Sequence, residues 1–183
     1  MPKLKVGEKM PDFAFETPYE KGLTIGQVAQ KVEGKTAVIF MRYYGCTMCQ
    51  YDIHLFKVQH DKIAATGGQM LVVLQSDPAK LAAQVKPGDL PFDIICDPDQ
   101  KLYKEFEINP AASKEEMSDA RTIAKRAERD AYEVKFTHGE YEGNELQLPA
   151  TFIVEKDLTI TFAEYHKGTG GVPSPDELAA LLK

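Results

Sequence analysis

The stretch TAVIFMRYYGCTMC, residues 36–49, decides the fold. Its first part, Thr36–Arg42, is an almost continuous apolar run, which is typical of a strand buried in a parallel sheet. Gly45 then allows the chain to turn, and a helical pattern begins near Cys46. The stretch therefore predicts a buried strand that gives way to a helix at a cysteine, with Cys49 one turn into that helix.

Strand and helix patterns alternate on both sides of this stretch. The helix is expected to run to about Ala65, because positions 49, 53, 56, 60 and 63 form one apolar line broken only by His60. The other expected elements, in chain order, are a strand at Phe13–Glu16, a strand at Met70–Gln75, a helix at Asp77–Val85, an edge strand or extended segment at Pro91–Cys96, a helix at Asp97–Phe106, a polar helix at Ser113–Asp130, a hairpin of Thr151–Val154 and Leu158–Tyr165, and a closing helix at Pro175–Leu182. This alternation predicts an α/β domain with a central mixed β-sheet and helices on both faces.

Length and composition limit the classes of protein that the chain can belong to. Its 183 residues suit one domain, and 22 basic against 28 acidic side chains give a net charge of −6. No basic stripe with interleaved aromatics is present, so no nucleic-acid partner is expected. The opening residues show no leader or anchor and the apolar runs are too short to cross a bilayer, so we expect a cytoplasmic protein without a membrane partner.

The two cysteines in C-x-x-C spacing indicate thiol chemistry. A helix N-terminus presents free N–H groups and a positive dipole end, and both lower the pKa of a thiol, so Cys46 is the expected nucleophile. Cys49 lies close enough to resolve a mixed disulfide or a sulfenic acid on Cys46. Two other interpretations stay open: half of a zinc site, for which a second ligand pair is missing, and a pair of inert core thiols. No metal or cofactor is expected.

A second feature is Pro149, directly before the strand at Thr151–Val154. A proline at the start of a strand costs no ladder hydrogen bond, which is the plain structural interpretation. The functional one is a cis-proline loop lying against the cysteine pair. The sequence does not distinguish the two isomers.

Together these features resemble the peroxiredoxin-like redoxins, the alkyl hydroperoxide reductase/thiol-specific antioxidant family of the thioredoxin superfamily, and within it the members with a C-x-x-C pair. The resemblance rests on the opening Val6–Phe13, the strand leading into Cys46, the segment Cys96–Asp99 and the strand Thr151–Val154. It implies one thioredoxin-like domain over residues 1–183, in which residues 107–147 form an insertion with a helix of its own.

Departures from the family pattern bear on the activity. Tyr43 stands where the family has a Thr or Ser three residues before its cysteine, Ile39 stands in place of a proline, and Pro149 stands where an arginine is usual. Those family groups bind and polarise the peroxide. The resemblance therefore implies thiol–disulfide exchange more than peroxide reduction, with an external thiol reductant such as a thioredoxin or glutathione system, and homodimers as a further option.

The side chains around the pair are assigned supporting roles. Arg42 is expected to stabilise the Cys46 thiolate or a substrate anion. Tyr43 and Tyr44 are expected to form a hydrogen-bonding wall over the sulfur or to pack, one of them in the core. Two residues are expected to be ordinary: Asp52, which could relay a proton, as a solvated helix carboxylate, and Cys96 as a small buried residue.

Three functions are compatible with this sequence. The first is a thiol–disulfide oxidoreductase that closes a bond between Cys46 and Cys49. The second is a thiol peroxidase in which a hydroperoxide oxidises Cys46 to a sulfenic acid and Cys49 condenses with it. The third is a non-catalytic redoxin that senses redox state or binds a partner.

Overall fold

The computed structural model describes residues 3–183, which build one seven-stranded sheet in the order β2-β1-β5-β4-β3-β6-β7. The strands are β1 (Ala14–Glu16), β2 (Lys21–Thr24), β3 (Thr36–Phe40), β4 (Gln69–Leu74), β5 (Asp93–Cys96), β6 (Ala150–Val154) and β7 (Ile160–Tyr165). β3, β4 and β5 are parallel, whereas β6 runs antiparallel to β3 and β7 to β6. The sheet is therefore mixed, as the sequence predicts.

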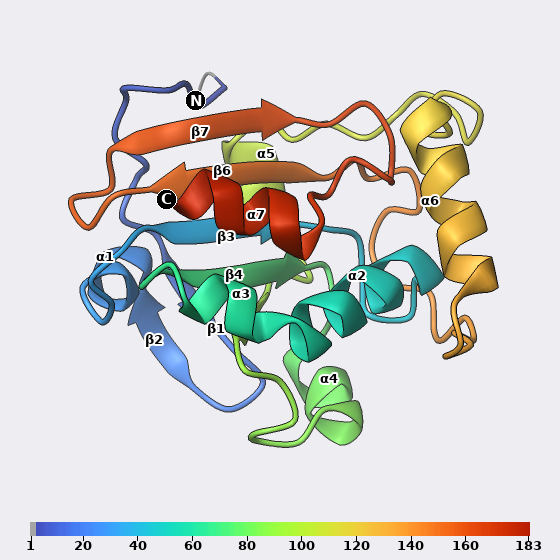
Figure 1. Cartoon of the computed structure of the whole chain (residues 1–183), viewed down its shortest axis with the longest axis horizontal. Coiled ribbons are helices and arrows are strands. Elements are labelled where there is room, and N and C mark those ends of the chain that lie inside the picture. The colour runs from blue at the N-terminus through green and yellow to red at the C-terminus, as the bar shows by residue number, and fades with distance from the viewer. Residues whose placement is uncertain (1–2) are drawn as a thin grey trace.

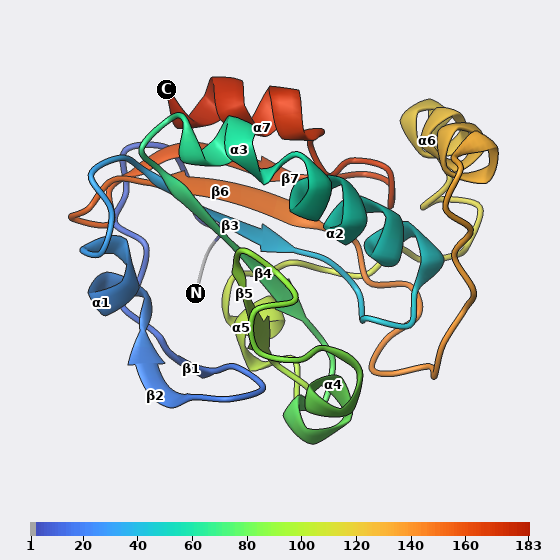
Figure 2. The same cartoon turned by 60° about the horizontal axis from the view of Figure 1, so that its bottom comes forward.

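Helices cover both faces of the sheet (Figures 1 and 2). They are α1 (Ile25–Ala29), α2 (Thr47–Val58), α3 (His60–Ala64), α4 (Pro78–Gln84), α5 (Lys101–Glu105), α6 (Ala120–Ala131) and α7 (Pro175–Leu182). In Figure 2, α2, α3 and α7 lie above the sheet, and α1 and α5 lie below it. No helix in the described part of the chain is long and apolar enough to span a membrane.

Alternation along β3 explains why there are two cores. Val38 and Phe40 point to the α1 and α5 side, where Phe40 packs edge-on against Tyr103 and Phe106. Ala37 and Ile39 point to the other side and join the core beneath α2 and α7. A strand buried on both faces needs apolar residues at every position, which is why its sequence is continuously apolar.

Four expectations about the elements need correction. The helix from Cys46 does not run to Ala65 but breaks at Gln59 into α2 and α3. The strand ending at Cys96 is not an edge, because β1 pairs with it through Glu16 and β2 lies outside β1. The helix expected from Ser113 begins only at Ala120, and the helix expected from Asp97 begins only at Lys101. The sequence did not predict the short elements β2 and α1.

The remaining elements follow the sequence closely. Asp77 caps α4 by accepting hydrogen bonds from the N–H groups of Ala79 and Lys80, and Ser174 caps α7 in a capping box with Glu177. β6 and β7 form the expected antiparallel hairpin.

Candidate active site

Cys46 lies at the end of the sheet where β3 gives way to α2 (Figure 1). Its backbone is extended, with φ −69° and ψ 125°, and its sulfur caps the helix by accepting from the N–H of Cys49 at 3.4 Å. A residue at this position receives the positive end of the helix dipole. Both sulfurs are enclosed, since Cys46 is 0% exposed and Cys49 is 5% exposed.

Arg42 contacts the sulfur of Cys46 directly. Its Nη2 donates to the Sγ of Cys46 at 2.9 Å, and its Nη1 donates to the backbone carbonyl of Glu145 at 2.7 Å. The guanidinium is thus clamped between the thiol and the segment after α6. Burial works against the charge of Arg42, but the neighbouring sulfurs raise its pKa well above the ordinary value.

The two thiols have opposite acidities. A hydrogen bond from Cys49 and the charge of Arg42 lower the pKa of Cys46 to about 5, although burial opposes this shift. Burial raises the pKa of Cys49 well above its ordinary value, and the Cys46 thiolate beside it adds to the effect. At neutral pH the site therefore holds a thiolate at Cys46 and a protonated thiol at Cys49.

Tyr43 and Tyr44 do not form a wall over the sulfur. The hydroxyl of Tyr43 donates to the carboxylate of Glu145 and lies 3.0 Å from Nε2 of His138. Burial and the Glu145 carboxylate raise the pKa of Tyr43. The backbone N–H of Tyr44 donates to Ser76 at 2.9 Å. Tyr43 is a core side chain at 0% exposure that ties the region to the segment after α6.

Pro149 lies against the cysteine pair, but the cis-proline loop of the functional interpretation is wrong. It lines the same narrow crevice as Cys46 and Cys49. Its peptide bond is trans, since residues 3–183 include no cis bond.

A segment from residues 137–145 packs over the turn at Gly45, directly before Cys46. The N–H of Gly139 donates to the carbonyl of Gly45 at 2.9 Å, and the side chain of Gln50 bridges that carbonyl to the carbonyl of Thr137. A Cβ on Gly45 would overlap the carbonyl of Glu140, so only glycine permits this close approach. We call residues 137–145 the covering segment. It belongs to the expected insertion 107–147.

Asp52 is not the solvated carboxylate that the sequence suggests. It is 3% exposed, and its Oδ1 lies 2.6 Å from the Nζ of Lys125, which projects from α6 and also donates to the carbonyl of Val172. Burial raises the pKa of Asp52 to about 6, with Lys125 partly offsetting the shift. Asp52 lines the crevice of Cys46 and Cys49, so α6 places a buried ion pair beside the thiols.

Other site residues carry no clear sequence signal. Thr169, from the turn after β7, lines the crevice, and Glu145 and His138 reach Tyr43 from the covering segment. All three come from irregular stretches far from Cys46 in sequence, so no periodicity marks them. Cys96 is a small buried residue, as expected, and burial raises its pKa to about 12.

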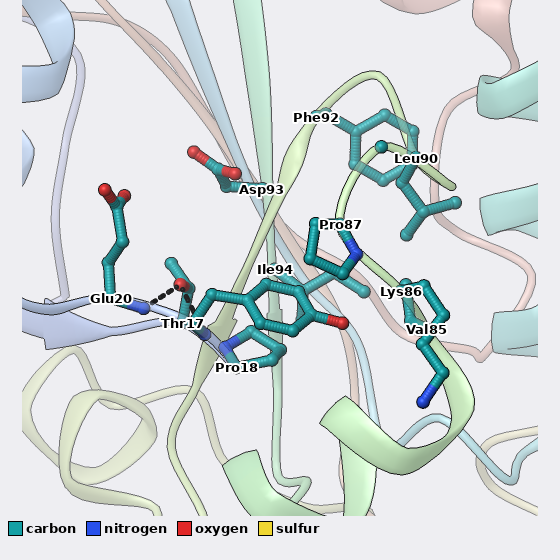
Figure 3. A pocket seen from close by; sticks show the side chains of 12 residues that line it. Thr17, Pro18, Glu20, Val85, Lys86, Pro87, Leu90, Phe92, Asp93 and Ile94 are labelled. Atoms are coloured by element: carbon teal, nitrogen blue, oxygen red, sulfur yellow. Dashed lines mark hydrogen bonds between the residues drawn. The ribbon is translucent and has the colours of Figure 1, made fainter.

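A separate hollow lies between the β1–β2 turn and the loop after α4 (Figure 3). Pro18, Pro87, Leu90 and Phe92 give it an apolar lining, and the nearest carboxylates are Glu20 and Asp93. No cysteine lines it. The two cysteines of the C-x-x-C pair line the other crevice.

Comparison with known proteins identifies the fold. The model of the AhpC/TSA family matches residues 6–163. The structure is similar to the peroxidoxin BcpB of Mycobacterium tuberculosis, with a TM-score of 0.66 and 12% identity over 98% of this chain and 96% of that one. It is also similar to Mycobacterium tuberculosis AhpC, with a TM-score of 0.63 and 17% identity over 99% and 92% of the two chains.

A thiol peroxidase from Chromobacterium violaceum is similar as well, with a TM-score of 0.61 and 11% identity over 98% of this chain and 87% of that one. No curated protein sequence matches the chain. The expected fold is confirmed: a thioredoxin-like α/β fold of the peroxiredoxin type.

Proposed function

Because the chain belongs to the AhpC/TSA family, whose members are thiol-dependent oxidoreductases, we propose that it acts through Cys46 as nucleophile and Cys49 as resolving thiol. The observation that carries this proposal is the pairing of Arg42 and Cys49 on one sulfur, which lowers the pKa of Cys46 to about 5. Thiol–disulfide exchange is proposed first, because Tyr43 and Pro149 stand where the family places the groups that bind and polarise a peroxide.

The proposed cycle has two displacement steps. The Cys46 thiolate attacks one sulfur of the substrate disulfide and releases the other half as a thiolate. Cys49 then loses its proton and attacks the Cys46 sulfur, which closes the 46–49 disulfide and releases the second half. The substrate gains two electrons and two protons, and an external dithiol or two monothiols return them by reopening the bond.

Access limits the size of the substrate. Cys46 is fully enclosed and its crevice is narrow, so the walls of the crevice have to move before a disulfide reaches the sulfur. A small disulfide requires a smaller opening than a folded protein. We therefore propose small disulfides as substrates and a thioredoxin or glutathione system as the reductant, in the cytoplasm.

Peroxide reduction is the second candidate, and the enclosure of Cys46 favours it. A hydroperoxide is small enough to reach a buried thiolate, and the guanidinium of Arg42 already contacts that sulfur. In this reaction the Cys46 thiolate attacks the terminal oxygen, the O–O bond breaks, and the rest of the hydroperoxide leaves as an alcohol, or as water when the substrate is hydrogen peroxide. The thiol of Cys49 then condenses with the Cys46 sulfenic acid, which forms the 46–49 disulfide and releases water. Tyr43 gives no help here, because its hydroxyl bonds to Glu145 and not to the sulfur.

One experiment tests both candidates. Fully reduced protein is mixed with oxidised glutathione or with hydrogen peroxide, and the 46–49 disulfide is followed by peptide mass spectrometry. Faster closure with oxidised glutathione supports exchange, and closure with peroxide alone supports the second candidate. Cys96→Ser is the matched control and should leave both rates unchanged. If neither oxidant gives a 46–49 disulfide, the proposed cycle is wrong.

A further inference from the structure

Two buried polar atoms near Cys46 have no hydrogen-bond partner within residues 3–183. They are Nε of Arg42 and the hydroxyl oxygen of Thr169. Buried polar groups are almost always paired, because an unpaired one keeps the full cost of losing its water. Both residues line the crevice that holds Cys46 and Cys49.

Two hydrogen bonds of the Arg42 guanidinium fix the direction of its unpaired Nε–H. Nη2 donates to the Cys46 sulfur, and Nη1 donates to Glu145, so the plane of the guanidinium is set at two points. Nε–H and an Nη2–H are the two parallel donors of one rigid fork. An acceptor held by Nε therefore lies next to the atom that Nη2 holds, which is the nucleophilic sulfur.

Thr169 is held in place by its backbone while its hydroxyl stays free. Its N–H donates to the carbonyl of Met117 at 3.1 Å, and the N–H of Gly170 donates to Thr122 on α6 at 2.9 Å. The side chain is 7% exposed. The turn is thus held in place by residues 117 and 122, while the Thr169 hydroxyl makes no structural hydrogen bond beside the crevice.

An adjoining groove indicates the class of ligand. Arg42 and Thr169 also line this groove, together with Lys114, Arg126, Tyr141 and His138. The rings of His138 and Tyr141 stack with centroids 4.2 Å apart. Of the two carboxylates in the lining, that of Glu145 already accepts from Tyr43. The groove therefore offers two cations and an aromatic surface continuous with the two free donors.

Resting on the proposed exchange reaction, we infer that Arg42 Nε and the Thr169 hydroxyl form a binding site for a carboxylate or peptide carbonyl oxygen of a small acidic disulfide. Two donors suit such an oxygen, which has two lone pairs. Lys114 and Arg126 attract the remaining acidic groups along the groove. The reaction is one disulfide reduced to two thiols while Cys46 and Cys49 are oxidised to their disulfide.

Thr169→Val tests the site, because valine keeps the shape and removes only the hydroxyl. Rates of 46–49 closure are measured with oxidised glutathione, which has carbonyls and carboxylates, with bis(2-hydroxyethyl) disulfide, which has neither, and with hydrogen peroxide. A charge-assisted hydrogen bond is expected to change the glutathione rate by about 10-fold or more, and the neutral disulfide by less than about 3-fold. Thr161→Val, on β7, is the matched control and should change neither rate.

Stability separates a binding role from a structural one. The Thr169 hydroxyl has no partner to lose, so Thr169→Val should melt at the wild-type temperature or higher. Arg126→Gln provides an independent test: it should slow oxidised glutathione alone, and added salt should reduce the difference from wild type.

Three outcomes would overturn the inference. They are equal losses with both disulfides, no loss with oxidised glutathione, or a loss confined to hydrogen peroxide, which would assign the donors to a hydroperoxide oxygen. Absence of 46–49 closure in the wild-type protein would instead refute the proposed function itself, so the two failures are distinguishable.

Discussion

Replacing Arg42 by methionine should raise the pKa of Cys46 and therefore lower the fraction of Cys46 that is thiolate at mildly acidic pH. Methionine keeps most of the side-chain length while removing the charge and the donor at 2.9 Å from the sulfur. The hydrogen bond from Cys49 remains, so the pKa of Cys46 should not return to its ordinary value of 9.0.

The size of the shift follows from the contact. An opposite charge within hydrogen-bond reach changes a pKa by about 1 to 3 units. Starting from about 5, the pKa of Cys46 in Arg42→Met should therefore lie between about 6 and 8. One unit corresponds to about 1.4 kcal/mol, so the guanidinium contributes roughly 1.4 to 4 kcal/mol to the preference for thiolate. At pH 6, the thiolate fraction should fall from about nine tenths to between about one half and one hundredth.

Ultraviolet absorbance of the thiolate measures this directly and does not depend on access to the buried sulfur. The titration uses reduced protein in a Cys96→Ser background, where Cys49 stays protonated because its pKa is raised. Lys101→Met, an exposed charge removal, is the control. A midpoint that is the same in Arg42→Met and in the control would refute the argument that Arg42 sets the acidity of Cys46.

Three further predictions follow from other contacts. Gly45→Ala should displace the covering segment, because the new Cβ overlaps the carbonyl of Glu140, and Cys46 should then react faster with a bulky maleimide. Asp52→Asn should leave the Lys125 charge buried and unpaired at a cost of about 3–5 kcal/mol in chemical denaturation, and Asp52→Asn with Lys125→Met should recover much of it. Burial lowers the pKa of His166 from 6.5 to about 4, so between those values only the unfolded state binds the proton, and stability decreases by roughly 3 kcal/mol as the pH is lowered through this range. His166→Gln should flatten that part of the stability profile measured by urea unfolding at pH 7 and near pH 4.

The sequence predicts elements well where one local signal acts alone. β3 is apolar at every position because both its faces are buried, and Asp77 with the following proline starts α4 where expected. The predicted start of α6 was wrong because two residues, Ser113 and Asp119, can both act as an N-cap. Ser113 and Glu116 do form the expected local hydrogen bond, at 3.2 Å, but it closes only a turn. The helix begins at Asp119, whose side chain accepts from Thr122.

Elements that depend on pairing with distant parts of the chain could not be predicted from the sequence. The strand ending at Cys96 has the composition of an edge strand, and only the return of β1 to Glu16 places it inside the sheet. The break at Gln59 has no glycine or proline to mark it. In both cases tertiary packing decides between alternatives that are locally similar in energy.

The site residues also fall into those that the local sequence predicts and those that only the fold brings together. Cys46, Cys49 and Arg42 lie within eight residues, so one strand–helix junction brings them together and the sequence shows them. Asp52 looked solvated only because its partner, Lys125, comes from α6, some seventy residues later in the chain.

This division bears on how the activity is controlled. The junction makes the thiolate, but the insertion supplies the covering segment over Gly45 and, through Met117, the bond that anchors Thr169. Changes in the insertion can therefore alter which substrates reach Cys46 without altering its acidity, whereas changes at Arg42 alter acidity for every substrate. The two kinds of variant should separate in kinetics: Arg42 variants shift the pH profile with all oxidants, and insertion variants change the ratio of rates between oxidants at a fixed pH.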